Sequence, residues 1–198
     1  MALARQHVEK DSYTEEDYLA WEEDALEKSE YADGQIWAMS GGTEPHAVLP
    51  VNIGAELRAA LRGRGCRVMS SDIKVWTAGA YYYPDLTVVC GPSQHRRRSR
   101  SIVTNPILVV EVLSPSTEKK DRGEKFMRYQ QIDTLKSYLI VSQDEPRIEQ
   151  FSRTEAGPWL YTPVSGLEGV LDIPALSISL KLADIYDQID FSNRAEDE

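Results

Sequence analysis

The chain of 198 residues lacks any apolar stretch close to the roughly 20 residues that a membrane-spanning helix needs. Its first residues, Met1–His7, contain no hydrophobic signal-peptide region. Only two cysteines are present, Cys66 and Cys90, and neither belongs to a metal-binding motif. These absences favour a reduced cytoplasmic protein that is not associated with a membrane and that packs both thiols in its core.

Other absences narrow the chemistry. The three histidines lie far apart, which argues against a histidine-rich metal site. The sequence contains no zinc motif, Walker loop, dinucleotide fingerprint or nucleophile elbow. A formal net charge of −10, from 22 basic and 32 acidic residues, argues against broad non-specific binding to a phosphate backbone. A local basic site stays open, because residues 95–100 read His-Arg-Arg-Arg-Ser-Arg.

The pattern of the chain predicts one α/β domain. Hydrophobic residues make up 41% and charged residues 27%, an ordinary composition for a globular domain of this length. Helical and strand segments follow in the order helix, sheet, helix, sheet. We expect a flexible start over residues 1–12, a folded domain over 13–190 and a frayed acidic end over 191–198.

Local signals place the elements. Thr14 caps a short first helix, and Asp33-Gly34 predicts the turn of a hairpin over 30–39. Pro50 indicates a late start or a kink in a helix over 45–62. The remaining predicted elements are one or two strands over 66–77, a strand over 82–90, a surface loop over 91–105, a strand over 106–113, a helix over 118–132, strands over 137–141, 147–151, 159–163 and 176–182, and a short helix over 183–186.

Glu111 is out of place in its segment. It lies near the end of the apolar run Pro106–Leu113, which is typical of a strand buried on both faces. Glutamate is almost never fully buried without a partner, because an isolated ionised carboxylate is very costly in an apolar medium. The fold must therefore supply a metal, a cation or a cleft, which makes Glu111 a candidate functional carboxylate.

Asp85 is its expected partner. Asp85 and Glu111 lie on successive predicted strands, and sequential strands are often neighbours in a sheet. Two carboxylates at similar depth can share one hard cation, and Mg²⁺ commonly takes one or two carboxylates plus substrate phosphates. Such an ion lowers the pKa of a bound water and offsets charge at a phosphorus centre.

At this point the sequence resembles the Uma2 family of the PD-(D/E)XK nuclease superfamily. The resemblance covers about residues 15 to 185. It rests on Glu30–Gly34, Met39–Gly42 with His46, Tyr83–Val89, Asn105–Thr117, Asp121–Lys125 and Lys136–Val141. It implies a restriction-endonuclease-like fold: a central mixed β-sheet flanked by helices, preceded by an N-terminal helix and a β-hairpin.

The resemblance also implies roles for single residues. Asp85 and Glu111 would bind one metal ion, Mg²⁺ or Mn²⁺. Leu113 stands where the superfamily pattern calls for lysine, so another lysine must serve. Lys125 is the preferred substitute, positioning the attacking water or stabilising developing negative charge, and Lys74 is the second candidate. Glu30 matches an N-terminal acid of the family, which would bind a second metal or hold a water.

Each candidate also has a simpler explanation. The simpler explanation for Asp85 is that it only satisfies backbone groups, and for Glu111 that it is a buried salt-bridge partner. Lys125 lies four residues after Asp121, the spacing of a surface ion pair. Three further alternatives are an exposed cross-strand charge for Glu30, a helix-start or surface group for His46 in place of a substrate contact, and a solvated loop for the arginines around Arg97 in place of a phosphate clamp.

Two functions remain open at this stage. The first is a Mg²⁺- or Mn²⁺-dependent endonuclease that hydrolyses phosphodiester bonds in DNA, acting as a homodimer by analogy with duplex cleavage on this fold. The second is a catalytically inactive nucleic-acid-binding or regulatory module of the same fold. Leu113 and the acidic net charge favour the second, and the pairing of Asp85 with Glu111 favours the first.

Overall fold

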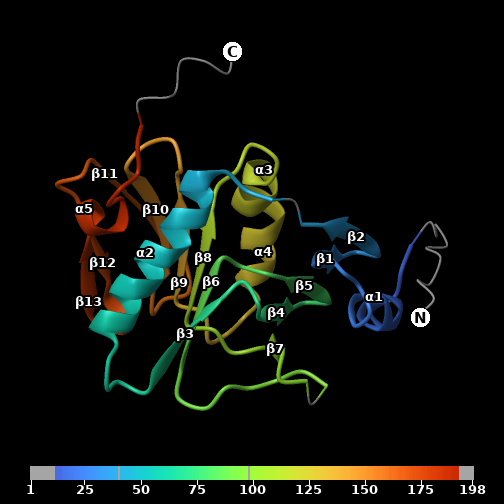
Figure 1. Ribbon diagram of the computed structural model, residues 1–198. Coiled ribbons are helices and arrows are strands. Elements are labelled where there is room, and N and C mark those ends of the chain that lie inside the picture. The colour runs from blue at the N-terminus through green and yellow to red at the C-terminus, as the bar shows by residue number, and fades with distance from the viewer. Residues whose placement is uncertain (1–11, 40, 98, 192–198) are drawn as a thin grey trace.

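The computed structural model describes residues 12–39, 41–97 and 99–191 (Figure 1). The expected flexible start and frayed acidic end lie outside these residues, apart from Ser12 and Phe191. Among the helices of the described part, none is long and apolar enough to cross a membrane.

A six-stranded mixed sheet forms the centre of the described structure. Its strand order is β11-β10-β9-β8-β6-β3. Strands β8 and β9 pair in parallel, and the other neighbours pair antiparallel. Both β8 and β9 are buried along their whole length, as their apolar sequences predict. The strands are β3 Cys66–Ser70, β6 Leu86–Cys90, β8 Leu108–Val112, β9 Ser137–Val141, β10 Arg147–Arg153 and β11 Trp159–Ser165.

Each face of this sheet packs against its own layer. On one face, Val110 and Val112 join the apolar side of α2 (Glu44–Ala60), the strand pair β12 (Val170–Ile173) and β13 (Ile178–Lys181), and α5 (Leu182–Ile185). On the other face, Val109 and Leu113 pack with Tyr129 beneath the helical stretch that follows β8. Alternate residues of β8 point to opposite faces, so Glu111 shares the face of Val109 and Leu113.

A five-stranded sheet lies beside the central one, with the order β2-β1-β5-β4-β7. It carries α1 (Glu15–Glu22), which Figure 1 shows on its outer side. The predicted hairpin is confirmed: Asp33 and Gly34 both adopt positive φ, at 47° and 80°, as a tight hairpin turn requires. The strands are β1 Ser29–Ala32, β2 Gln35–Ala38, β4 Lys74–Thr77, β5 Ala80–Tyr82 and β7 Ile102–Val103.

The single strand predicted over 82–90 is wrong. Strand β5 ends at Tyr82 and β6 begins at Leu86, and the two belong to different sheets. Pro84 lies in the gap and has no N–H to donate to a strand partner, which explains the break. Asp85 therefore lies in the short connection between the two sheets.

The helix predicted over 118–132 is interrupted. A short α-helix, α3 (Glu118–Lys120), passes into a π-helical segment, Asp121–Lys125, and then into α4 (Phe126–Tyr129). A π-helical turn inserts an extra residue and rotates the side chains that follow it, and such turns are frequent at functional sites. Asp121 and Lys125 are both buried, with 1% and 4% of their surface exposed.

Pro50 neither delays the start of α2 nor divides the helix in two. The helix runs continuously over Glu44–Ala60, with Thr43 as its N-cap and Pro50 inside it. Leu49, Ile53 and Leu57 are buried along one side, and this packing offsets the hydrogen bond that Pro50 removes.

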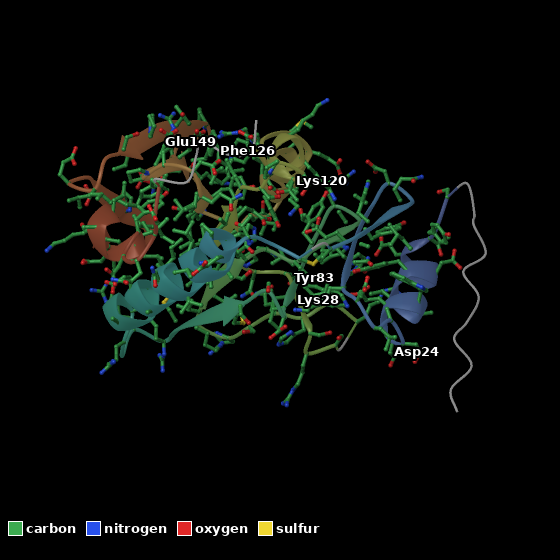
Figure 2. All side chains as sticks on the ribbon, turned by 45° about the horizontal axis from the view of Figure 1, so that its top comes forward. Asp24, Lys28, Tyr83, Lys120, Phe126 and Glu149 are labelled. Carbon is green, nitrogen blue, oxygen red and sulfur yellow. A yellow bond between two sulfur atoms is a disulfide. The ribbon has the colours of Figure 1, made fainter. Side chains whose placement is uncertain are left out.

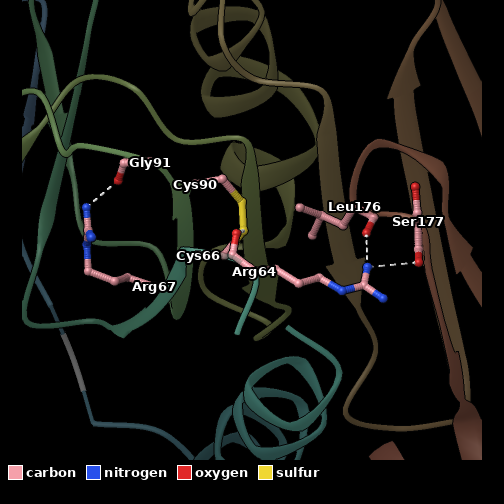
Figure 3. The surroundings of a disulfide bond; sticks show 7 residues. All are labelled: Arg64, Cys66, Arg67, Cys90, Gly91, Leu176 and Ser177. Carbon is pink, nitrogen blue, oxygen red and sulfur yellow. Dashed lines mark hydrogen bonds between the residues drawn. A yellow bond between two sulfur atoms is a disulfide. The ribbon is translucent and has the colours of Figure 1, made fainter. Parts of the chain in front are cut away.

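The two cysteines are not free thiols. Cys66 at the start of β3 pairs in register with Cys90 at the end of β6, and the two form a disulfide (Figure 3). The prediction of two reduced thiols is therefore wrong. The sequence does not indicate this contact, because the two residues are 24 positions apart and no local pattern shows that their strands are neighbours. The loop predicted over 91–105 also contains a short strand, β7, paired with β4.

Candidate active site

A cavity of about 230 Å³ opens where the two sheets meet. Its walls come from the β1–β2 hairpin, the start of α2, the connection before β6, the end of β8 and the π-helical segment. Seven acidic or basic residues line it: Glu30, His46, Asp85, Glu111, Lys120, Asp121 and Lys125. Five of the seven residues predicted for the site are therefore brought together.

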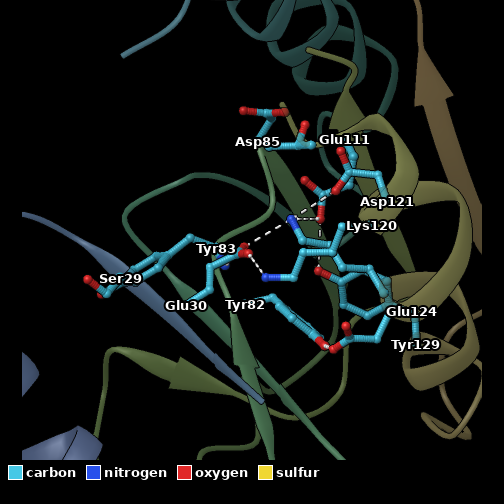
Figure 4. A network of polar contacts seen from close by, with 12 residues as sticks. Ser29, Glu30, Tyr82, Tyr83, Asp85, Glu111, Lys120, Asp121, Glu124 and Tyr129 are labelled. Carbon is cyan, nitrogen blue, oxygen red and sulfur yellow. Dashed lines mark hydrogen bonds and ion pairs between the residues drawn. The ribbon is translucent and has the colours of Figure 1, made fainter. Parts of the chain in front are cut away.

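Glu111 projects from β8 and is 3% exposed. Its Oε1 lies 3.1 Å from Lys125 Nζ and accepts a hydrogen bond from the hydroxyl of Tyr129 at 3.0 Å (Figure 4). The buried carboxylate therefore has the partners that its burial demands. Its contact with Lys125 is the buried salt bridge that the sequence offers as the simpler explanation for Glu111.

Lys125 lies at the centre of the charged network, in contact with three carboxylates. Besides Glu111, its Nζ contacts Glu30 Oε1 at 2.9 Å and Asp121 Oδ1 at 3.0 Å. The pair with Asp121 has the i,i+4 spacing expected from the sequence, but it is buried and not on the surface. Glu30 is also buried, so its reading as an exposed charge is wrong.

Asp85 is fixed against β8 by a backbone contact. Its Oδ2 accepts the N–H of Val112 at 2.7 Å, and the side chain of His46 places Nε2 4.0 Å from the same oxygen. Leu86 pairs with Val110 in the antiparallel ladder, so the register, continued by one residue, sets Asp85 opposite Glu111. The two carboxylates thus lie at corresponding depths, as the sequence predicts.

Glu30, Asp85 and Glu111 differ in their tendency to ionise. Burial raises the pKa of Glu111 well above its usual value; Lys125 opposes this, while repulsion from Asp121 and Asp85 adds to it. Burial also raises the pKa of Asp85, against the hydrogen bond from Val112. Burial would raise the pKa of Glu30 as well, but attraction to Lys125 and Lys120 lowers it below the usual value.

Lys125 is held in its charged form. Burial alone would lower its pKa, but attraction to Glu111, Glu30 and Asp121 raises the pKa of Lys125 well above the ordinary lysine value. Lys125 is therefore a hydrogen-bond donor and a fixed positive charge at neutral pH, and not a base.

The donor chemistry of the cavity suits a hard divalent cation. With all groups ionised, four carboxylates (Glu30, Asp85, Glu111, Asp121) against two ammonium groups (Lys120, Lys125) leave two negative charges. Carboxylate oxygens are the ligands that Mg²⁺ and Mn²⁺ prefer, and Mg²⁺ keeps several waters when only two carboxylates bind it. Within the described residues, no three His, Cys, Asp or Glu side chains already stand together as a complete ligand set.

Two predicted site residues lie elsewhere. Lys74 is buried beside Glu22, 3.7 Å from its Oε1, and faces the ring of Tyr83. Arg97 forms an ion pair with Glu16 of α1. Neither residue lines the cavity.

Arg96, next to Arg97, is also tied to the N-terminal layer. It bonds Glu15 at 2.8 Å and stacks 3.8 Å over the ring of Trp76. The described arginines 96 and 97 of this cluster thus hold α1 against the five-stranded sheet instead of facing the carboxylates.

The sequence did not identify every residue that contacts the charged groups or lines the rim. Asp121 and Lys120 contact Lys125 and Glu30, Tyr129 contacts Glu111, and Trp37 lines the rim. Asp121, Lys125 and Tyr129 are spaced four residues apart, which indicated a shared helix face. No local signal marks Trp37, because its position depends on the pairing of β1 with β2.

Two proteins are similar in sequence to most of this chain. In Synechocystis sp. strain PCC 6803, uncharacterized protein slr1290 is 39% identical over 173 residues, covering 86% of this chain and 90% of its own length. Uncharacterized protein sll1609 of the same strain is 32% identical over 167 residues, covering 83% and 94%.

A solved structure shares the fold. The crystal structure of "a putative nuclease belonging to DUF820" from Anabaena variabilis ATCC 29413 superposes with a TM-score of 0.70 at 14% identity. The superposition covers 86% of this chain and 96% of that chain. Residues 15–183 match the Uma2 family, described as "Putative restriction endonuclease". The domain limits of 13–190 stay a prediction. With the family match spanning most of the chain and two relatives above 30% identity, this protein belongs to the Uma2 family.

Proposed function

We propose that this protein is a metal-dependent endonuclease that hydrolyses phosphodiester bonds in DNA. The observation that carries the proposal is the position of Lys125, whose Nζ lies 3.1 Å from Glu111 Oε1. This lysine supplies, from the helical stretch, the positive charge that Leu113, directly after β8, does not supply. The nuclease descriptions of the family and of the structural neighbour support the same reaction class.

Asp85 and Glu111 are the proposed ligands of a Mg²⁺ or Mn²⁺ ion. When bound, such an ion lowers the pKa of a coordinated water and offsets negative charge at the phosphorus. Burial and repulsion from neighbouring acids raise the pKa of Glu111, and only its ionised form can act as a ligand, so protons compete with the metal at this residue. Metal binding should therefore weaken as the pH falls.

Lys125 is the proposed electrostatic residue of the reaction. Its ammonium stays charged because three carboxylates surround it, so it can donate a hydrogen bond to a phosphate oxygen and stabilise charge that develops there. Glu30 is the proposed positioning residue, because its two oxygens contact Lys125 and Lys120 at 2.9 and 3.1 Å. His46, which lies at the cavity wall beside Asp85, is the proposed phosphate contact.

Cleavage of supercoiled plasmid and of single-stranded DNA, with and without Mn²⁺, tests this function. The wild type should nick DNA only with the metal. The cleavage rate of Asp85→Asn should be at least about 100-fold lower than that of the wild type, as expected when a key electrostatic group is removed. Asp133→Asn, an exposed acid outside the cavity, is the matched control. Equal activity in Asp85→Asn and wild type would reveal a contaminating nuclease and reject the proposed site.

A catalytically inactive, nucleic-acid-binding module is the second candidate function. Leu113 and the ion pairs that hold Lys125 to three carboxylates favour it. Crystals soaked in Mn²⁺ would distinguish the two. Anomalous density between Asp85 and Glu111 supports the nuclease, and an unchanged ion-pair cluster together with DNA binding supports the inactive module.

Further expectations accompany the proposal. A homodimer would present two sites to a DNA duplex, and light scattering after gel filtration measures that state. We also propose a cytoplasmic location. The Cys66–Cys90 disulfide argues against this location, because disulfides are rare in a reducing cytosol. Trapping of free thiols in freshly lysed cells would reveal the state of the pair.

Lys74 and Arg97 have no part in the proposed mechanism, because their ion pairs with Glu22 and Glu16 lie outside the cavity.

A further inference from the structure

Trp37 lies at the rim of the cavity on the outermost strand of the five-stranded sheet. In the β1–β2 ladder it pairs directly with Glu30. Residues directly opposite each other in an antiparallel pair project to the same face, so Trp37 and the buried acid Glu30 both face the cavity. Trp37 also lines the cavity together with Ala38 and Met39.

The exposure of this ring distinguishes it from the other tryptophans. The chain contains four tryptophans, all within the described residues, and only Trp37 is exposed, at 37% of its surface. Exposed edge strands usually carry charged or otherwise protective residues, because apolar edges invite aggregation. An exposed tryptophan on such an edge, beside a charged cavity, is typical of a binding surface.

Lys120 links this ring to the charged cluster. Its ammonium lies 3.7 Å from the centroid of the Trp37 ring and 3.1 Å from Glu30 Oε2. Figure 2 shows Lys120 on the side of the helical stretch that faces the hairpin. An aromatic ring and a lysine ammonium thus lie next to each other in the wall of the cavity that holds the carboxylates.

We propose that Trp37 stacks on an unpaired nucleobase with the ring face that Lys120 does not cover, while Lys120 contacts the adjoining phosphate. The preferred substrate is then a single-stranded or locally unpaired nucleic acid, because bases within a duplex cover one another's faces. This inference rests on the proposed nuclease function and specifies its substrate class. Aromatic stacking of this kind is tolerant of sequence, since every base presents a π-face.

Fluorescence anisotropy with two labelled probes tests the inference on the full chain. One probe is single-stranded oligothymidylate and the other is an abasic strand of the same length, both in Ca²⁺ to support binding without turnover. The wild type should bind the base-bearing probe about tenfold more tightly than the abasic probe. Trp37→Ala should bind both probes equally, and Trp37→Phe should keep most of the preference.

Two further variants separate the roles. Tyr161→Ala, which changes an exposed aromatic on the edge strand β11, is the matched control and should keep the wild-type preference. Lys120→Gln should weaken binding of both probes alike and reduce the slope of log affinity against log salt by about one.

The outcomes that overturn the inference are distinct from failure of the proposed function. Equal wild-type affinity for both probes, or a preference that survives in Trp37→Ala, rejects the stacking role while Mn²⁺-dependent cleavage can still stand. Tighter wild-type binding of a duplex than of oligothymidylate rejects the substrate class. Wild-type protein that binds no DNA probe and cleaves no DNA rejects both proposals together.

Discussion

The ammonium of Lys125 lies 3.1 Å from the carboxylate of Glu111, although Leu113, the residue directly after β8, stands where the superfamily pattern calls for lysine. The contact joins the π-helical segment to the central sheet and is buried on both sides. The lysine thus reaches the same face of the sheet from a different element, because Glu111 and Leu113 point to the layer that contains this segment.

Lys125→Met should destabilise the fold strongly at neutral pH. The variant keeps the apolar stem but leaves Glu30, Glu111 and Asp121 without their shared counter-charge, and breaking a buried ion pair costs about 3–5 kcal/mol. Urea denaturation measures the change in the free energy of unfolding. The double variant Glu111→Gln, Lys125→Met should recover part of the loss. A loss below about 1 kcal/mol in the single variant would show that the network contributes little to stability.

A second ion pair predicts how stability depends on pH. Burial alone would raise the pKa of Glu149, but hydrogen bonds and attraction from Arg122 and Arg147 lower it below the ordinary value of 4.5. A lowered folded pKa contributes stability above the unfolded pKa and loses it as the pH falls through the folded pKa.

Glu149→Gln should therefore be about 1 kcal/mol less stable than the wild type at pH 7, since both arginines are partly exposed and solvent screens the pair. The difference should shrink as the pH falls below about 4.5. Chemical denaturation across pH measures it, with the exposed Glu155→Gln as control. A difference that does not depend on pH would assign the effect to packing and not to charge.

The disulfide gives a third prediction. Cys66 and Cys90 close a loop with a sequence separation of 24. Cross-linking a loop of this size lowers the entropy of the unfolded chain, which raises the free energy of unfolding by about 3 kcal/mol. Reductant should lower the melting temperature of the wild type. It should leave the variant Cys66→Ala, Cys90→Ala unchanged. Equal melting temperatures of oxidised and reduced wild type would contradict a stabilising bridge.

Much of the fold follows from local patterns. The Asp33-Gly34 turn, the cap of α1 at Thr14 and the continuous apolar runs of β8 and β9 are all read directly from the residues, and the structure confirms them. The strand pair β12–β13 is only partly anticipated, because Val170–Ile173 carries a weak alternating pattern.

The errors share a cause, which is dependence on tertiary contacts. The break between β5 and β6, the π-helical turn after α3 and the Cys66–Cys90 bridge each require knowledge of which segments lie side by side. In the site, the sequence alone predicts that Asp85 lies near Glu111, because successive strands are often neighbours. The sequence does not predict the positions of Trp37 and Lys120, because they depend on how the hairpin meets the helical stretch.

Titration of the protein with Mn²⁺, followed by electron paramagnetic resonance, tests the central claim most directly, because it reports the ion at Asp85 and Glu111 independently of activity. The wild type should bind Mn²⁺ at neutral pH and less tightly at acidic pH, as the raised pKa values of Glu111 and Asp85 require. Asp85→Asn and Glu111→Gln should each lose this binding, and Asp133→Asn should keep it. Wild-type protein that binds no Mn²⁺, or variants that bind it as tightly as the wild type, would contradict the account.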